Sequence, residues 1–182
     1  MTTPARRPRT GRPGAAVLIA VCLAGCFPAF DWRESRPQGS GATLLFPCRP
    51  DAQERSVQVG SIPLRIQMHS CKAGGFTFSL AFADVAEPLQ VAPALLALRR
   101  SAIDNVGGTA AALPLPAIAG ATPNPESRFL GIEGRFPDGR PVVVRAAFFV
   151  KGLKVYQATI VGPREQPAGE SPETFFSAIR LS

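Results

Sequence analysis

Two stretches of alternating side chains constrain the fold of this chain more than any other feature. Residues 62–69 and residues 76–82 each place an apolar residue at every second position. Successive side chains of a strand point to opposite faces of a sheet, so this alternation is typical of strands with one buried face. Ala73-Gly74-Gly75 lies between the two stretches, and its composition predicts a hairpin loop.

The register of this hairpin depends on the length of its loop. A two-residue turn at Gly74-Gly75 pairs Met68 with Ala81 and separates the two apolar sets. A three-residue loop pairs Met68 with Leu80 and keeps both apolar sets on one face of the sheet. The sequence therefore predicts the three-residue loop.

Four further segments are expected to be strands: residues 42–46, 129–136, 142–150 and 153–161. Residues 142–150 are almost continuously apolar, which is typical of a central strand covered on both faces. The second and third of these segments are separated by the turn residues Pro137-Asp138-Gly139. The chain is thus rich in short strands joined by tight turns, and an antiparallel arrangement is expected.

Two helices are expected to pack against this sheet. Apolar residues follow helical spacing over residues 89–106, and Gly107-Gly108 then ends the helix. Ser171 begins a second helix, with Pro172 at its first position. Residues 109–125 carry no charge and are predicted to be an irregular connection, either a mobile excursion or a partner surface or lid. The predicted fold is α+β, a mostly antiparallel sheet of about six strands with two helices packed against it.

The end of the chain resembles Mog1/PsbP-like domains. Tyr156-Gln157-Ala158-Thr159 is followed, after a loop, by the aromatic-rich segment Phe175-Phe176-Ser177-Ala178-Ile179-Arg180-Leu181. This resemblance covers about 30 residues and implies an antiparallel sheet flanked by helices. It also implies a family whose members mostly bind or assist assembly. No functional motif matches, so no binding residue is transferred.

The N-terminus has the pattern of an export signal. Four arginines precede an uncharged apolar run at residues 15–24, and Leu23-Ala24-Gly25-Cys26 then resembles the lipobox of bacterial lipoproteins. The resemblance implies cleavage between Gly25 and Cys26 and a lipid on the Cys26 thiol. We therefore expect a signal peptide at 1–25, a lipidated tether at 26–41 and a single α+β domain at 42–182.

Two other readings of this N-terminus stay open, an uncleaved signal anchor and an ordinary secretory signal. The apolar region from Gly14 to Phe30 is short for a spanning helix, which needs about 20 predominantly apolar residues. Phe27 follows Cys26, where an aspartate often favours retention in the inner membrane. The expected location is the cell envelope, anchored in the outer membrane and facing the periplasm, and the alternative is an inner-membrane protein with an uncleaved anchor.

Removal of the signal changes the charge of the chain. The full sequence has 20 basic and 13 acidic residues and a net charge of +7, but four arginines leave with the signal and the remainder is +3. These charges are scattered without a basic run, so the sequence predicts no nucleic-acid partner.

The cysteines fall into three groups. Cys22 leaves with the signal and Cys26 carries the lipid, so Cys48 and Cys71 remain to form a disulfide in an oxidising compartment. The predicted hairpin register places Cys71 and His69 on the polar face, near the surface. The alternative is a nucleophilic Cys71 served by His69, the only histidine.

The sequence contains no recognisable catalytic motif, no metal-ligand spacing and no cofactor fingerprint. The leading hypothesis is a binding or assembly module that reaches the membrane through lipid on Cys26 and meets an envelope protein partner. The alternative is an envelope hydrolase or thiol enzyme whose active site is assembled from dispersed residues.

Overall fold

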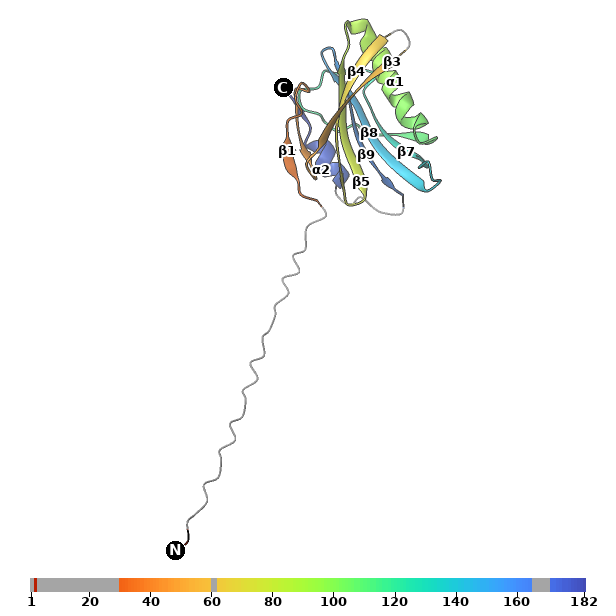
Figure 1. Ribbon diagram of the computed structural model, residues 1–182. Coiled ribbons are helices and arrows are strands. Elements are labelled where there is room, and N and C mark those ends of the chain that lie inside the picture. Colours follow the sequence, from red (N-terminus) through yellow and green to blue (C-terminus); the bar gives the residue numbers. More distant parts are fainter. Residues whose placement is uncertain (1, 3–29, 60–61, 165–170) are drawn as a thin grey trace.

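The computed structural model describes residue 2 and residues 30–59, 62–164 and 171–182, and within them it shows an α+β fold with two antiparallel sheets (Figure 1). The strands are β1 (Arg33–Ser35), β2 (Ala42–Phe46), β3 (Asp51–Val59), β4 (Ile62–Ala73), β5 (Phe76–Asp84), β6 (Thr109–Leu113), β7 (Arg128–Arg135), β8 (Pro141–Lys151), β9 (Lys154–Pro163) and β10 (Arg180–Leu181). The helices are the 3-10 turn η1 (Pro88–Gln90), α1 (Val91–Asp104) and α2 (Ser171–Ser177).

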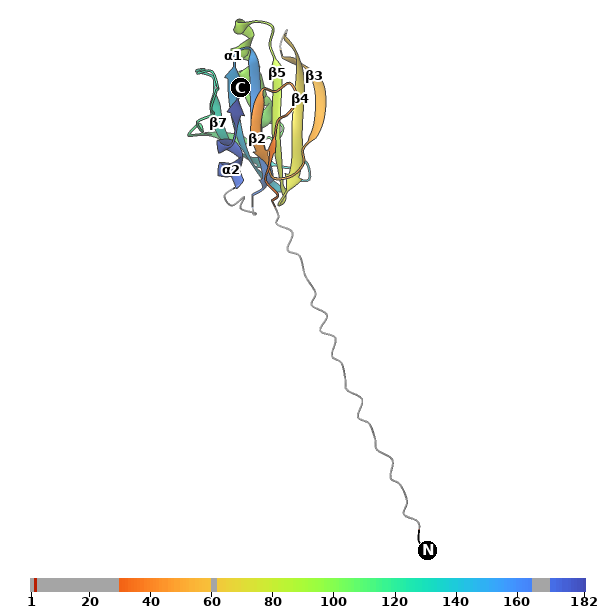
Figure 2. The ribbon, with the colours of Figure 1, turned by 90° about the vertical axis from the view of Figure 1, so that its left-hand side faces the viewer.

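A seven-stranded sheet forms the centre of the molecule, in the order β3-β4-β5-β9-β8-β7-β6. Helix α1 packs on one face, while α2 and the small sheet β1-β2-β10 pack on the other (Figures 1 and 2). The predicted fold class is therefore confirmed. The predicted central strand at 142–150 is β8, which is buried along most of its length.

Both faces of the central sheet are apolar, and each has its own core. Under α1 the core includes Phe148, Val155 and Leu95. On the other face an aromatic core includes Phe78 and Phe175. Strands β5 and β9, which pair with each other, contribute to both cores.

The predicted register of the β4–β5 hairpin is wrong. Ala73 pairs with Phe76 and Met68 with Ala81, so the turn contains only Gly74 and Gly75. Both glycines have positive φ, 56° and 81°, which suits a two-residue hairpin turn. The prediction assumed that the sheet has one apolar face. Because both faces of β5 are covered, the apolar side chains of β4 and those of β5 can lie on opposite faces of the sheet.

This register also places Cys71 differently from the prediction. Cys71 pairs with Phe78, and its side chain is only 7% exposed because it belongs to the aromatic core. The expectation of a surface position on a polar face is therefore wrong. A cysteine on the second covered face of a sheet is buried like any small apolar residue.

The strands β1, β3, β6 and β10 were not predicted. Strand β3 has exposed side chains along its described length, so it lacks the apolar alternation of a half-buried strand. Strand β6 lies within the segment expected to be irregular, where it pairs with β7 at the edge of the large sheet.

The domain begins earlier than the sequence predicts, because residues 30–41 belong to the fold instead of forming part of a tether. Strand β1 pairs with β2, and the Asp31 amide donates a hydrogen bond to the Pro47 carbonyl at 2.9 Å. Tyr156, which is 1% exposed, donates from Oη to the Ser40 carbonyl at 2.6 Å. This bond ties the N-terminal segment to the central strand β9.

We predict that Tyr156 makes the fold sensitive to alkali. Burial, with a smaller contribution from the Asp84 carboxylate, raises its pKa to about 12 from 10.0. The folded state therefore holds this proton more tightly than the unfolded chain does, and the stabilisation is lost as the pH rises from about 10 to 12. Tyr156→Phe should lower the free energy of unfolding by about 1 kcal/mol at neutral pH, because the Ser40 carbonyl loses its donor.

Urea denaturation of both proteins at several pH values checks this prediction. The difference between Tyr156→Phe and the parent should shrink as the pH rises above 10 and reverse in sign before pH 12, because the raised pKa corresponds to more free energy than one hydrogen bond. A constant difference across that range would contradict it.

We also predict unequal effects of alanine on the packing around two glycines. Gly74 and Gly152 both have φ of 56°, which L side chains rarely adopt, so alanine strains the backbone at each. A Cβ at Gly74 would lie 2.5 Å from Cζ of Phe30, whereas a Cβ at Gly152 has nothing within 4 Å. Gly74→Ala should displace the Phe30 ring, which stacks on Trp32 at 5.9 Å.

The emission of Trp32, the only tryptophan, reports on that displacement. We expect Gly74→Ala to change the emission and Gly152→Ala to leave it unchanged. Identical spectra of the two variants would show that Phe30 does not dock against the turn.

Candidate functional site

A groove beside α1 is a concave site on the described part of the molecule. Helix α1 has 14 residues and is therefore about 21 Å long, while the 12 residues of β4 extend for about 40 Å. One helix cannot cover the whole face of such a sheet. The uncovered part, toward the Gly74-Gly75 turn, forms the floor of a groove of about 390 Å³.

A row of hydroxyl groups crosses this floor. Ser70 on β4 pairs with Ser79 on β5, and Ser79 pairs with Thr159 on β9. Ser79 and Thr159 are 8% and 6% exposed, and their hydroxyls hydrogen-bond to each other. Paired residues of neighbouring strands share a face, so the three hydroxyls lie side by side on the groove side of the sheet.

Two more rows of side chains surround the hydroxyl row. Toward α1 lie Gln53, Met68, Ala81 and Gln157, and on the other side lie Thr77 and Val161. Amide and hydroxyl groups both donate and accept hydrogen bonds without carrying charge. Among the described residues, Arg55 is the only charged residue in the lining. The floor is therefore suited to an uncharged polar ligand with apolar parts.

The groove continues into a wider hollow of about 1000 Å³ between α1 and the β3–β4 hairpin. Its walls include Leu96 and Val57, which are 48% and 37% exposed. The two hollows share Val57, Ile66, Leu98 and Ser101, so they form one continuous depression.

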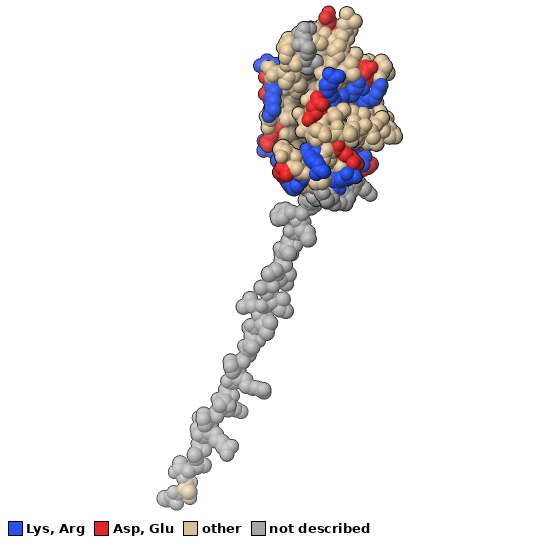
Figure 3. Space-filling view, turned by 90° about the vertical axis from the view of Figure 1, so that its right-hand side faces the viewer, with Lys and Arg blue, Asp and Glu red and all other residues tan. Residues whose placement is uncertain are grey.

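Charged residues of both signs lie around the side of the molecule that carries α1 (Figure 3). Arg99, in the wall of the wider hollow, forms an ion pair with Glu126 at 2.8 Å. Because Arg99 is only 16% exposed in its side chain, this pair fixes α1 against the segment before β7.

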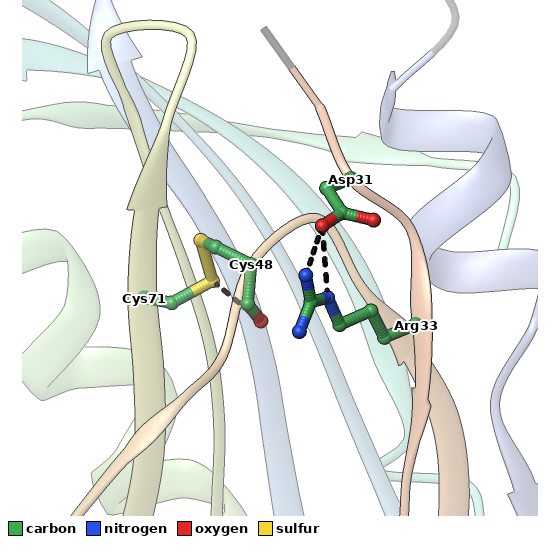
Figure 4. Close-up of a disulfide and its surroundings, with 4 residues drawn as sticks. All are labelled: Asp31, Arg33, Cys48 and Cys71. Carbon is green, nitrogen blue, oxygen red and sulfur yellow. Dashed lines mark hydrogen bonds and ion pairs between the residues drawn. A yellow bond between two sulfur atoms is a disulfide. The ribbon is translucent and has the colours of Figure 1, made fainter. Parts of the chain in front are cut away.

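The disulfide predicted between Cys48 and Cys71 is present. It joins the segment after β2 to β4, with the two Cα atoms 6.0 Å apart (Figure 4). Asp31 and Arg33 form an ion pair close to it. A cysteine in a disulfide has no thiolate, so Cys71 does not act as the nucleophile of the alternative thiol-enzyme hypothesis.

His69 lies two residues from Cys71 on β4 and borders a separate small cavity of about 330 Å³. Its ring stacks on Phe82 with 6.2 Å between centroids, and partial burial lowers its pKa below the usual 6.5. His69 thus favours the neutral form on the side of the sheet opposite the hydroxyl row.

The remaining predicted site residues lie outside the described residues. Gly25 and Cys26, the predicted cleavage and lipidation positions, belong to the part of the chain that the structure does not describe. Within the described ranges, no helix is long and apolar enough to cross a bilayer. The same residues contain no group of three or more His, Cys, Asp or Glu side chains placed to hold a metal ion.

Comparisons with known proteins leave the family open. No protein-family model matches the sequence, and no curated protein matches it significantly.

Sequence reasoning missed the groove although its signal was present. Thr77 and Ser79 alternate with phenylalanines on β5, and Gln157 and Thr159 share a face of β9. Each pattern by itself indicates a solvated face. Only the pairing of β5 with β9 shows that the polar positions join across strands.

We predict that the disulfide stabilises the fold substantially. Its cysteines are separated by 23 residues, and closing a loop of this length contributes about 3 kcal/mol in the chain-entropy model. Cys48→Ala with Cys71→Ala should lower the free energy of unfolding by about this amount, as measured in urea. The double variant should be insensitive to reductant, and a parent protein equally insensitive to reductant would contradict the prediction.

Proposed function

We propose that this protein is a lipid-anchored lipoprotein of the bacterial cell envelope that acts as a binding or assembly module. The anchoring rests on Leu23-Ala24-Gly25-Cys26 and the basic and apolar segments before it. The Cys48–Cys71 disulfide supports export, because such bonds persist in oxidising compartments. Phe27 after Cys26 supports the outer membrane, with the domain facing the periplasm.

The groove beside α1 is the proposed binding site. The observation that carries this proposal is the row Ser70–Ser79–Thr159, which lies on the floor of an open depression in the centre of the sheet. Ligand sites are commonly concave and lined by apolar side chains with a few polar groups that fix orientation. The size of the groove, about 390 Å³, lies within the range of small-ligand or peptide-segment sites.

The resemblance to Mog1/PsbP-like domains supports binding over catalysis as the proposed role. It rests on the Tyr156 strand and the segment around Phe175, which form β9 and α2 of the structure. The ligand class is proposed from the groove itself, as an uncharged hydrogen-bonding molecule or protein segment.

We predict that Cys26→Ala abolishes lipid attachment. Intact-mass measurement of the parent protein from membranes should show loss of residues 1–25 and addition of lipid, because only the Cys26 thiol can carry the thioether. The variant should carry no lipid, both in any protein released to the soluble periplasmic fraction and in any protein that retains its signal. A parent protein that keeps residues 1–25 would instead indicate an uncleaved anchor.

We predict that blocking the groove abolishes binding without unfolding the domain. Ser101 is exposed on α1 and borders both hollows, so Ser101→Trp fills the depression at little structural cost. Ser177→Trp, at an exposed position on α2 and the other side of the sheet, is the matched control.

A photo-crosslinking amino acid placed at Asn105, which borders the groove, reports occupancy in living cells. A defined adduct should form in the parent and in Ser177→Trp, and it should fall several-fold in Ser101→Trp. Equal adduct in both variants would rule out the groove as the binding site.

A further inference from the structure

The chain between the lipidated cysteine and the folded domain is short. Phe30 is part of the fold, so only Phe27, Pro28 and Ala29 separate it from Cys26. Four residue steps span at most about 14 Å between the Cα atoms of Cys26 and Phe30. The sequence-based tether of 26–41 would have been about four times longer.

Phe30 is held firmly at one end of the large sheet. Its ring lies beside the Gly74-Gly75 turn and meets Trp32 and Phe78 with centroids 5.9 and 6.1 Å away. Trp32 in turn meets Phe78 edge to face at 5.9 Å. Detaching residues 30–32 from the domain would lengthen the tether. It would also expose the Phe30 and Trp32 rings and break the Asp31–Pro47 hydrogen bond.

Two hairpin turns and the C-terminal end of β9 lie at this same end, which we call the turn end. Strand pairing places the Gly74-Gly75 turn, the Phe136–Arg140 turn and the segment Pro163–Arg164 there, because Thr77 pairs with Val161 and Val142 with Pro163. Phe30, where the described domain begins, lies beside this end, and η1 follows β5 at the opposite end (Figures 1 and 2). Strand lengths put the two ends about 35 to 40 Å apart.

The turn end carries an aromatic residue and a cation that suit a headgroup layer. Arg140 lies over the Phe136 ring, 5.5 Å from its centroid, and Phe136 is only partly buried. Its guanidinium also forms an ion pair with the Asp138 carboxylate at 2.7 Å, but 72% of the Arg140 side chain is exposed, so further donors face solvent. Aromatic rings are favoured at the depth of lipid headgroups, and arginine binds their phosphates.

We propose that the domain docks end-on, with the turn end resting on phospholipid headgroups and the opposite end directed away from the membrane. This inference rests on the proposed lipidation of Cys26. In this orientation the hydroxyl row lies in the membrane-proximal half of the groove, and the exposed Leu89, at 85%, points into the aqueous space.

The test uses full-length protein, processed in cells and reconstituted in vesicles of phosphatidylethanolamine and phosphatidylglycerol. A photo-crosslinking amino acid replaces one exposed residue at a time: Pro137 at the turn end, Glu87 at the opposite end, or Arg36 beside β1 on the flank. Mass spectrometry counts phospholipid adducts after illumination. We expect several-fold more adduct at Pro137 than at either control position.

The other outcomes distinguish a failure of end-on docking from a failure of the proposed lipidation. Comparable adducts at Pro137 and Arg36 would show that the domain lies on its side, and comparable adducts at Pro137 and Glu87 would show a freely tumbling domain. Either result overturns end-on docking while lipidation stands. Lack of lipid on Cys26 in the intact mass would overturn both proposals.

A variant with a longer chain between Cys26 and Phe30 tests whether the short tether causes the end-on docking. A long flexible Gly/Ser insertion between Ala29 and Phe30 leaves the lipid and the fold unchanged but removes the short reach. The adduct at Pro137 should fall toward the level at Glu87. An unchanged adduct would overturn the argument from tether length.

Discussion

The burial of β5 and β9 on both faces is the constraint on which the rest of this structure depends. Phe78 and Tyr156 point into the aromatic core, while Ala83 and Val155 lie on the opposite face under α1. A sheet with two apolar faces needs a cover on each side. Helix α1 supplies one cover, and α2 with the small sheet supplies the other. The N-terminal segment is therefore a necessary part of the fold.

The covers differ in extent, and the difference creates the groove. The aromatic side is closed by α2, β2 and the residues before β2, while the other side has a single diagonal helix. Where α1 does not reach, the sheet changes from apolar side chains to Ser70, Ser79 and Thr159. The change from methyl to hydroxyl groups along the same face indicates a surface that meets water or a ligand. The site is thus a consequence of helix length and local sequence together.

The N-terminal segment connects the fold to the proposed anchoring. The Tyr156–Ser40 hydrogen bond, the Cys48–Cys71 disulfide and the packing of Phe30 fix the path of the chain from residue 30 onward. The composition of residues 26–41, rich in Arg, Gly, Ser and Pro, predicts a flexible tether. The packing of residues 30–41 against the sheet shortens the distance between the proposed lipid and the domain. Under the proposed anchoring, the fold would set the orientation of the domain on the membrane.

The sequence by itself determined the fold class, β2, β4, β5, β7, β8, β9, both helices and the Cys48–Cys71 pair, because these depend on local periodicity, turn residues and cysteine count. Tertiary structure decided the two-residue turn at Gly74-Gly75 and the burial of Cys71, because local alternation does not reveal whether one face or both are covered. It also decided β3 and β6, whose exposed side chains carry no apolar period, and the hydroxyl row. That row exists only where β4, β5 and β9 meet, and the register between strands is set by the cores on both sides.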